Sequence, residues 1–153
     1  MRRALAAIAA TGGVLALLAG SPYPLDVQRL AKAVAREDDH VTAVELAAWI
    51  RGRKPGLRII DLRTPAEFKD YHLPRAENVA IDALTSTPFR SDETIVLVSG
   101  AGGHAAQGWV FLQALGHRNV FFLRGGQDEW LEAMKQQPEI GRYFGGVRRR
   151  DGC

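Results

Sequence analysis

One stretch of this chain, residues 95–105, limits the possible folds more than any other. Ile95-Val96-Leu97-Val98 is a short apolar run, mostly β-branched, and predicts a buried strand. Ser99-Gly100-Ala101-Gly102-Gly103-His104 is a glycine-rich turn, and an apolar helix begins at Ala105. In α/β proteins this layout directs backbone N–H groups of the turn and of the helix N-terminus towards one point, where an anion binds. Ser99 stands at the strand end, where a nucleophile would be placed.

Strand and helix signals alternate along the rest of the chain. Residues 57–61, 78–81 and 120–123 have the composition of short buried strands. Helices are predicted before and between these strands, and two of them open with capping boxes, at residues 42–45 and 64–67. This alternation predicts an α/β fold of three layers, α/β/α, with a central, mostly parallel sheet. Ligands of such sheets bind beyond the carboxyl ends of the strands.

The helix expected from Ala105 to about Leu115 is apolar nearly all round, so we expect it to be well buried. We also interpret Trp49, Trp109 and Trp130 as core residues.

The N-terminus has the form of a targeting segment, which we place at residues 1–21. Arg2 and Arg3 precede an apolar run from Ala4 to Ala19, as in a secretory signal. Cleavage is disfavoured because Pro22 would follow the Ala19-Gly20-Ser21 triplet. We expect a hydrophobic helix kept as a membrane anchor, with a cleaved signal and a buried core helix as alternatives. Both the anchor and the cleaved signal place the domain outside the cytoplasm, in the periplasm or on the extracytoplasmic face of the inner membrane. If the anchor is retained, its N-terminus stays in the cytoplasm.

Residues 22–40 are predicted to form a stiff linker and an amphipathic helix. The two prolines of Ser21-Pro22-Tyr23-Pro24 restrict the backbone, and Asp26 has the position of a helix cap. One stripe of the helix is apolar: Val27, Leu30, Ala31 and Val34. We expect this helix to pack on the domain, and binding to a partner is the alternative.

Composition excludes several functions. A chain of 153 residues suits one domain, and a net charge of +3 is too small to indicate nucleic-acid binding. The single cysteine, Cys153, allows neither an internal disulfide nor a zinc site, and we expect no metal and no cofactor. Residues 137–153 form a basic tail. We expect Cys153 to lie at the disordered end of this tail. The alternatives are that it pairs with a cysteine of another chain or that it delivers sulfur to the Ser99 loop.

Four segments give the chain a resemblance to the rhodanese homology domain over about residues 41–134. Residues 61–68 look like the family's Asp-x-Arg-x-x-x-Glu-aromatic segment, and residues 71–79 look like its Gly-His-Ile-Pro-Gly-Ala-x-Asn segment. Residues 95–109 stand in the place of its active-site loop, and residues 123–130 match its closing Gly-Gly-x-x-x-Trp. The resemblance implies a sulfurtransferase fold, in which a loop cysteine carries sulfur as a persulfide and the loop usually ends in arginine.

This chain departs from the family at both diagnostic loop positions, because Ser99 stands for the cysteine and His104 for the arginine. Sulfur transfer needs a soft, ionised nucleophile, and a thiol of reference pKa about 8.5 is readily ionised in a cradle of N–H dipoles. A serine hydroxyl is a far weaker acid and needs an adjacent base. We therefore predict no catalytic residue.

Other interpretations of the loop are weaker. A serine hydrolase would pair Ser99 with His104, but the Gly-x-Ser-x-Gly elbow is missing. Residues 100–105 fit a dinucleotide fingerprint formally, yet the next strand is followed by Arg124 instead of an acid. Two interpretations of residues 99–104 remain. The loop either binds a small anion or is kept only because the fold needs this connection.

The remaining polar residues are given structural roles. We expect Asp61, Arg63 and Glu67 to form a supporting polar and capping network beside the loop, and His72 to be a hydrogen-bonded turn residue. The sequence thus predicts a non-catalytic, exported, membrane-anchored accessory subunit of a larger, membrane-associated protein assembly. The alternative is a sulfur-handling protein that uses the loop with Cys153 or a partner thiol.

Overall fold

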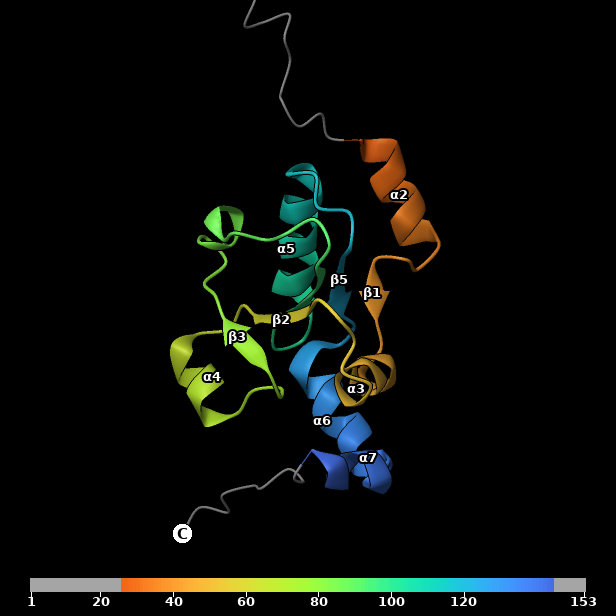
Figure 1. Ribbon diagram of the computed structural model, residues 1–153, viewed down its shortest axis with the longest axis vertical. Helices are drawn as coiled ribbons and strands as arrows, with labels where there is room; N and C mark the ends of the chain where they lie inside the picture. The colour runs from red at the N-terminus through yellow and green to blue at the C-terminus, as the bar shows by residue number, and fades with distance from the viewer. Residues whose placement is uncertain (1–25, 145–153) are drawn as a thin grey trace, which may run out of the picture.

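Five short strands form one parallel sheet in the order β1-β5-β4-β2-β3, in the computed structural model that describes residues 26–144 (Figure 1). The strands are β1 (His40–Val41), β2 (Leu57–Asp61), β3 (Ala76–Asn78), β4 (Thr94–Val98) and β5 (Val120–Leu123). All pairings among them are parallel, which confirms the predicted α/β fold. The predicted anchor, the Ser21–Pro24 linker and Cys153 lie outside the described residues.

Helices cover both faces of the sheet (Figure 1). On one face, α3 (Ala43–Arg51), α6 (Gly126–Gln136) and α7 (Pro138–Tyr143) enclose a core that includes the fully buried Trp130. On the other face, α2 (Val27–Ala35), the 3-10 turn η1 (Leu84–Ser86) and α5 (Gly103–Ala114) enclose a core around Trp109. Helix α4 (Pro65–Asp70) connects β2 to β3. Within residues 26–144 we find no helix with the length and apolar character that a membrane span requires.

Strand β4 lies at the centre of the sheet, and all of its residues are buried. It pairs with β2 in a register that places Val98 beside Asp61. The carboxyl ends of these two strands therefore lie next to each other, and the loop after β4 begins beside the polar residues that follow β2.

The caps predicted from the sequence are confirmed. Thr42 with Glu45 and Thr64 with Glu67 form complete capping boxes, and Pro65 occupies the first turn of α4. The Asp26 carboxylate accepts a hydrogen bond from the Arg29 N–H at 2.9 Å, so α2 begins where the sequence predicts. Side chains close in sequence thus satisfy backbone donors that each helix start leaves free.

Two strand predictions need correction. The brief strand expected at residues 78–81 lies earlier in the chain, as β3 (Ala76–Asn78). Its last bond to β2 is donated by the Val79 N–H to the Asp61 carbonyl, and the chain then enters a turn. Strand β1 was not predicted. It has only two residues, too few for an alternating pattern, and exists because it pairs with β5.

Two burial predictions also need correction. Helix α5 buries one face only, since Val110 and Phe111 are 39% and 44% exposed. Trp49 is half-buried at the edge of the core, with the Lys54 ammonium over its ring. Helix α2 packs on the domain, as expected, through Leu30, the one residue of its apolar stripe that is buried.

Candidate functional site

The loop between β4 and α5 begins in the core and ends at the surface. Ser99 is buried, whereas Ala101, Gly103 and His104 are exposed. Gly102 has a φ of 91°, a left-handed conformation that glycine adopts without strain, and it is the N-cap of α5. The chain thus turns sharply at the carboxyl end of β4 and enters α5 at Gly103, two residues before the expected start.

The N-terminus of α6 holds this loop by its carbonyl groups. The Gln127 N–H donates to the Ser99 carbonyl at 2.9 Å, and the Asp128 N–H donates to the Gly100 carbonyl at 3.2 Å. Gly126 makes this approach possible, because a Cβ atom there would overlap both of these carbonyl oxygens. The contact satisfies two donors at the start of α6 and turns the loop carbonyls towards that helix.

The N–H groups of the loop have few acceptors. The Ser99 hydroxyl oxygen accepts a hydrogen bond from the Ala105 N–H at 3.2 Å. The five N–H groups from Gly100 to His104 donate to no acceptor in the part of the chain that the structure describes. They lie at the N-terminus of α5, where the helix dipole adds positive potential. This set of donors suits a small anion.

Nothing in the described structure activates Ser99 as a nucleophile. Its hydroxyl contacts no histidine or carboxylate within hydrogen-bond distance in residues 26–144. His104 stands exposed on the first turn of α5 and makes no hydrogen bond with Ser99. The geometry therefore offers a place for negative charge without an attacking group.

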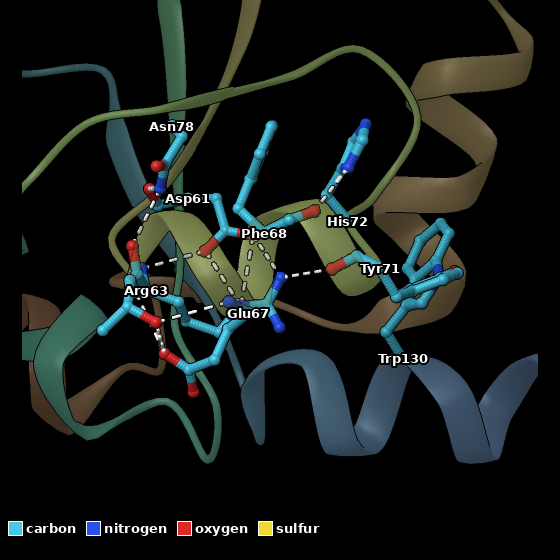
Figure 2. Close-up of polar contacts among 9 residues, drawn as sticks. Asp61, Arg63, Glu67, Phe68, Tyr71, His72, Asn78 and Trp130 are labelled. Atoms are coloured by element: carbon cyan, nitrogen blue, oxygen red, sulfur yellow. Dashed lines mark hydrogen bonds and ion pairs between the residues drawn. The ribbon is translucent and has the colours of Figure 1, made fainter. Parts of the chain in front are cut away.

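A buried ion pair fixes the chain that follows β2. The Arg63 Nη2 donates to Asp61 Oδ2 at 2.6 Å and to the Tyr71 carbonyl at 2.7 Å, and Figure 2 shows the guanidinium between these two acceptors. Asp61 also accepts from the Arg63 N–H at 3.0 Å, and the Asp61 side chain is fully buried. The Asn78 amide donates to the carbonyls of Asp61 and Arg63 at 3.0 and 2.8 Å. Between Asp61 and Arg63, the Leu62 N–H donates to the carbonyl of Val98, the last residue of β4 before the loop.

Glu67 does not join this ion pair. It is exposed and belongs to the capping box of α4, where its carboxylate accepts from the Thr64 N–H at 3.0 Å. Hydrogen bonds from the Thr64 side chain and backbone lower the pKa of Glu67. The structure therefore brings Asp61 and Arg63 together and leaves Glu67 as a local cap.

Tyr71 is a residue of this region that the sequence analysis missed. Its hydroxyl accepts a hydrogen bond from the Trp130 indole N–H at 3.0 Å, and burial raises the pKa of the phenol. With the contact between its carbonyl and Arg63, Tyr71 links the ion pair to α6 (Figure 2). The neighbouring His72 donates from its ring nitrogen Nδ1 to the Phe68 carbonyl at 2.8 Å, and its imidazole stacks on the Phe68 ring. This is the hydrogen-bonded turn role that the sequence predicts for His72.

The described residues hold no group of three or more His, Cys, Asp or Glu side chains that would bind a metal ion. The candidate site of this fold is therefore the loop of residues 99–104, with the Asp61–Arg63 pair as its support.

Comparison with known proteins gives one family. The family model described as the rhodanese-like domain matches residues 42–133. A solved structure from Staphylococcus saprophyticus is 29% identical over 60% of this chain and 92% of that chain, with a TM-score of 0.52. A rhodanese-related protein from Thermoplasma volcanium is 22% identical and covers 62% of this chain and 92% of that chain, with a TM-score of 0.55.

A human single-domain sulfurtransferase is 23% identical and covers 61% of this chain and 95% of that chain, with a TM-score of 0.55. The similarity to the Thermoplasma and human proteins supports the fold alone. No curated protein matches this chain.

The close contact between α6 and the loop predicts that adding a methyl group at position 126 destabilises the fold. Gly126→Ala should lower the free energy of unfolding by more than about 2 kcal/mol, because φ is +60° and the Cβ meets backbone carbonyls that cannot move aside. Gly103→Ala is the matched control, since a Cβ there meets nothing within 4 Å. Urea denaturation of both variants measures the difference. Equal stabilities would contradict the close approach of α6 to the loop.

Proposed function

Because this chain belongs to the rhodanese-like domain family, whose fold is linked to sulfur transfer, we propose that it is a non-catalytic member that binds a small anion in the loop of residues 99–104. We propose further that it is exported, anchored in the membrane and part of a larger assembly as an accessory subunit.

The observation that carries the proposal is that Ser99 has a buried hydroxyl with no base beside it among the described residues. By the resemblance of the loop to the family motif, Ser99 stands where the family has its cysteine. Its buried hydroxyl accepts a hydrogen bond from the Ala105 N–H at 3.2 Å. No base activates it among the described residues, and an oxygen–sulfur adduct would be a poor store of transferable sulfur. The serine supports a role in shaping the loop instead of attacking a substrate.

Anion binding is supported by the donors that remain. The N–H groups of residues 100–104 lack protein acceptors in the described structure, and the outer part of the loop is exposed. A neutral serine adds no negative charge of its own to this site. An oxyanion such as sulfate or thiosulfate would find several N–H donors and the N-terminal end of a helix dipole.

Export and anchoring are proposed from the sequence alone. Arg2 and Arg3 precede the apolar run from Ala4 to Ala19, with the basic end expected in the cytoplasm. The described domain would then stand on the outer face of that membrane, where the partner subunits of the assembly are expected.

The proposed anion site predicts a charge effect at His104. His104→Asp should weaken binding of sulfate about tenfold or more, because a carboxylate would stand beside the bound anion. An acidic residue in the first turn favours the helix, so the fold should be retained. His104→Asn is the uncharged control and should stay within a few-fold of wild type.

The titration follows the amide resonances of residues 100–104 as sodium sulfate, and separately thiosulfate, is added at constant ionic strength. Saturable shifts confined to these amides are expected. If they do not move with either anion, or if all three proteins bind equally well, the proposal of an anion site fails.

The absence of catalysis gives a second prediction. The full-length protein should transfer no sulfur from thiosulfate to cyanide above the blank, because Ser99 is not ionised. Activity that is present in wild type and lost in Cys153→Ser would instead establish the alternative, in which the tail thiol carries sulfur. The Ser99→Ala variant is the control that tests the loop hydroxyl separately.

A further inference from the structure

Helix α2 leaves most of its apolar stripe exposed to solvent. Val27 and Val34 are 63% and 54% exposed, and Ala31 lies between them and is also exposed. Their spacing places all three on one face of the helix. A single exposed valine needs no explanation, but two on one short helix face form a surface that water alone does not favour.

The contacts of Leu30 and Arg29 with the domain fix the orientation of this stripe. Leu30 is buried in the core on the α5 side of the sheet. The Arg29 Nη1 donates to the Gln113 side-chain oxygen at 2.7 Å, near the C-terminal end of α5. These contacts hold α2 along one edge of the apolar stripe, at Leu30, and leave Val27, Ala31 and Val34 exposed beside it.

The charge on α2 has one sign. Arg29 and Lys32 lie within the helix and Arg36 is its C-cap, whereas no acidic residue occurs between Val27 and Arg36. A helix that combines an apolar stripe with basic residues is typical of segments that lie in the headgroup region of a bilayer.

We propose that the exposed apolar stripe of α2 lies in the headgroup region of the membrane that holds the proposed anchor. This inference rests on the anchoring proposed above. Only six residues, 20–25, separate the end of the apolar run at Ala19 from Asp26, the cap of α2. A stretch of that length spans at most about 25 Å when fully extended, so an anchored chain places α2 near the bilayer surface. Val27, Ala31 and Val34 then insert between the headgroups.

Docking in this way orients the domain. Helix α2 precedes β1 and lies at the end of the molecule opposite to α6 and α7 (Figure 1). The anion loop follows the carboxyl end of β4, and its helix α5 rises about 15 Å from Gly103 before it reaches Gln113 beside α2. The loop of residues 99–104 would therefore face away from the bilayer, open to a partner or to the aqueous compartment.

The test uses the full chain in a Cys153→Ser background, which removes the only cysteine. Val34→Cys carries an environment-sensitive fluorophore, and the protein is reconstituted into vesicles of phosphatidylcholine and phosphatidylglycerol. Val44→Cys is the matched control, because Val44 is an exposed valine (41%) on α3, which follows the carboxyl end of β1. We expect blue-shifted emission and quenching by lipid-borne quenchers at position 34, and neither at position 44.

Flotation of the vesicles separates the two proposals. Protein that floats with the vesicles while the label at position 34 stays in water overturns the docking of α2 and leaves the anchor intact. A label at position 34 that is shielded without quenching by lipid indicates a protein contact, from a second copy or another chain, and also overturns it. Protein that does not float overturns the anchor and the docking together.

Discussion

The contact between the N-terminus of α6 and the loop after β4 determines what this site can do. Two N–H groups of α6 bind the carbonyls of Ser99 and Gly100, at 2.9 and 3.2 Å. A peptide group whose carbonyl is held on one side presents its N–H on the other. The N–H groups in the same peptide units are those of Gly100 and Ala101, which this contact therefore turns away from α6. The N–H groups of residues 100–104 have no protein acceptor in the described structure. Gly126 is the residue that lets the two backbones approach.

The residue at position 99 decides how these donors are used. A thiolate there would be stabilised by the same N–H groups and by the dipole of α5, because both favour negative charge. The serine hydroxyl stays neutral and takes one donor, the Ala105 N–H. The remaining donors then have no internal charge to stabilise, so an anion from solution can take that place. The exchange of sulfur for oxygen at this one position is therefore the basis of the proposal that the loop binds an anion and does not catalyse sulfur transfer.

Local signals in the sequence predict the parts of the fold that depend on neighbouring residues. The capping boxes, the buried strand β4 and the glycine-rich loop are all of this kind. Contacts between distant segments leave no such signal: β1 has two residues that depend on β5, and Tyr71 meets Trp130 across 59 positions. The exposure of Val110 and Phe111 was missed because an apolar sequence does not reveal which side of a helix the sheet covers.

The central claim, that this loop stabilises negative charge without a nucleophile of its own, is tested most directly by giving it one. Ser99→Cys in a Cys153→Ser background has a single thiol, whose pKa is measured from the pH dependence of alkylation by iodoacetamide. The account predicts a thiol pKa well below the reference value of about 8.5, because the loop N–H groups and the helix dipole favour the thiolate. A pKa at or above about 8.5, as expected for a buried thiol without such donors, would contradict it.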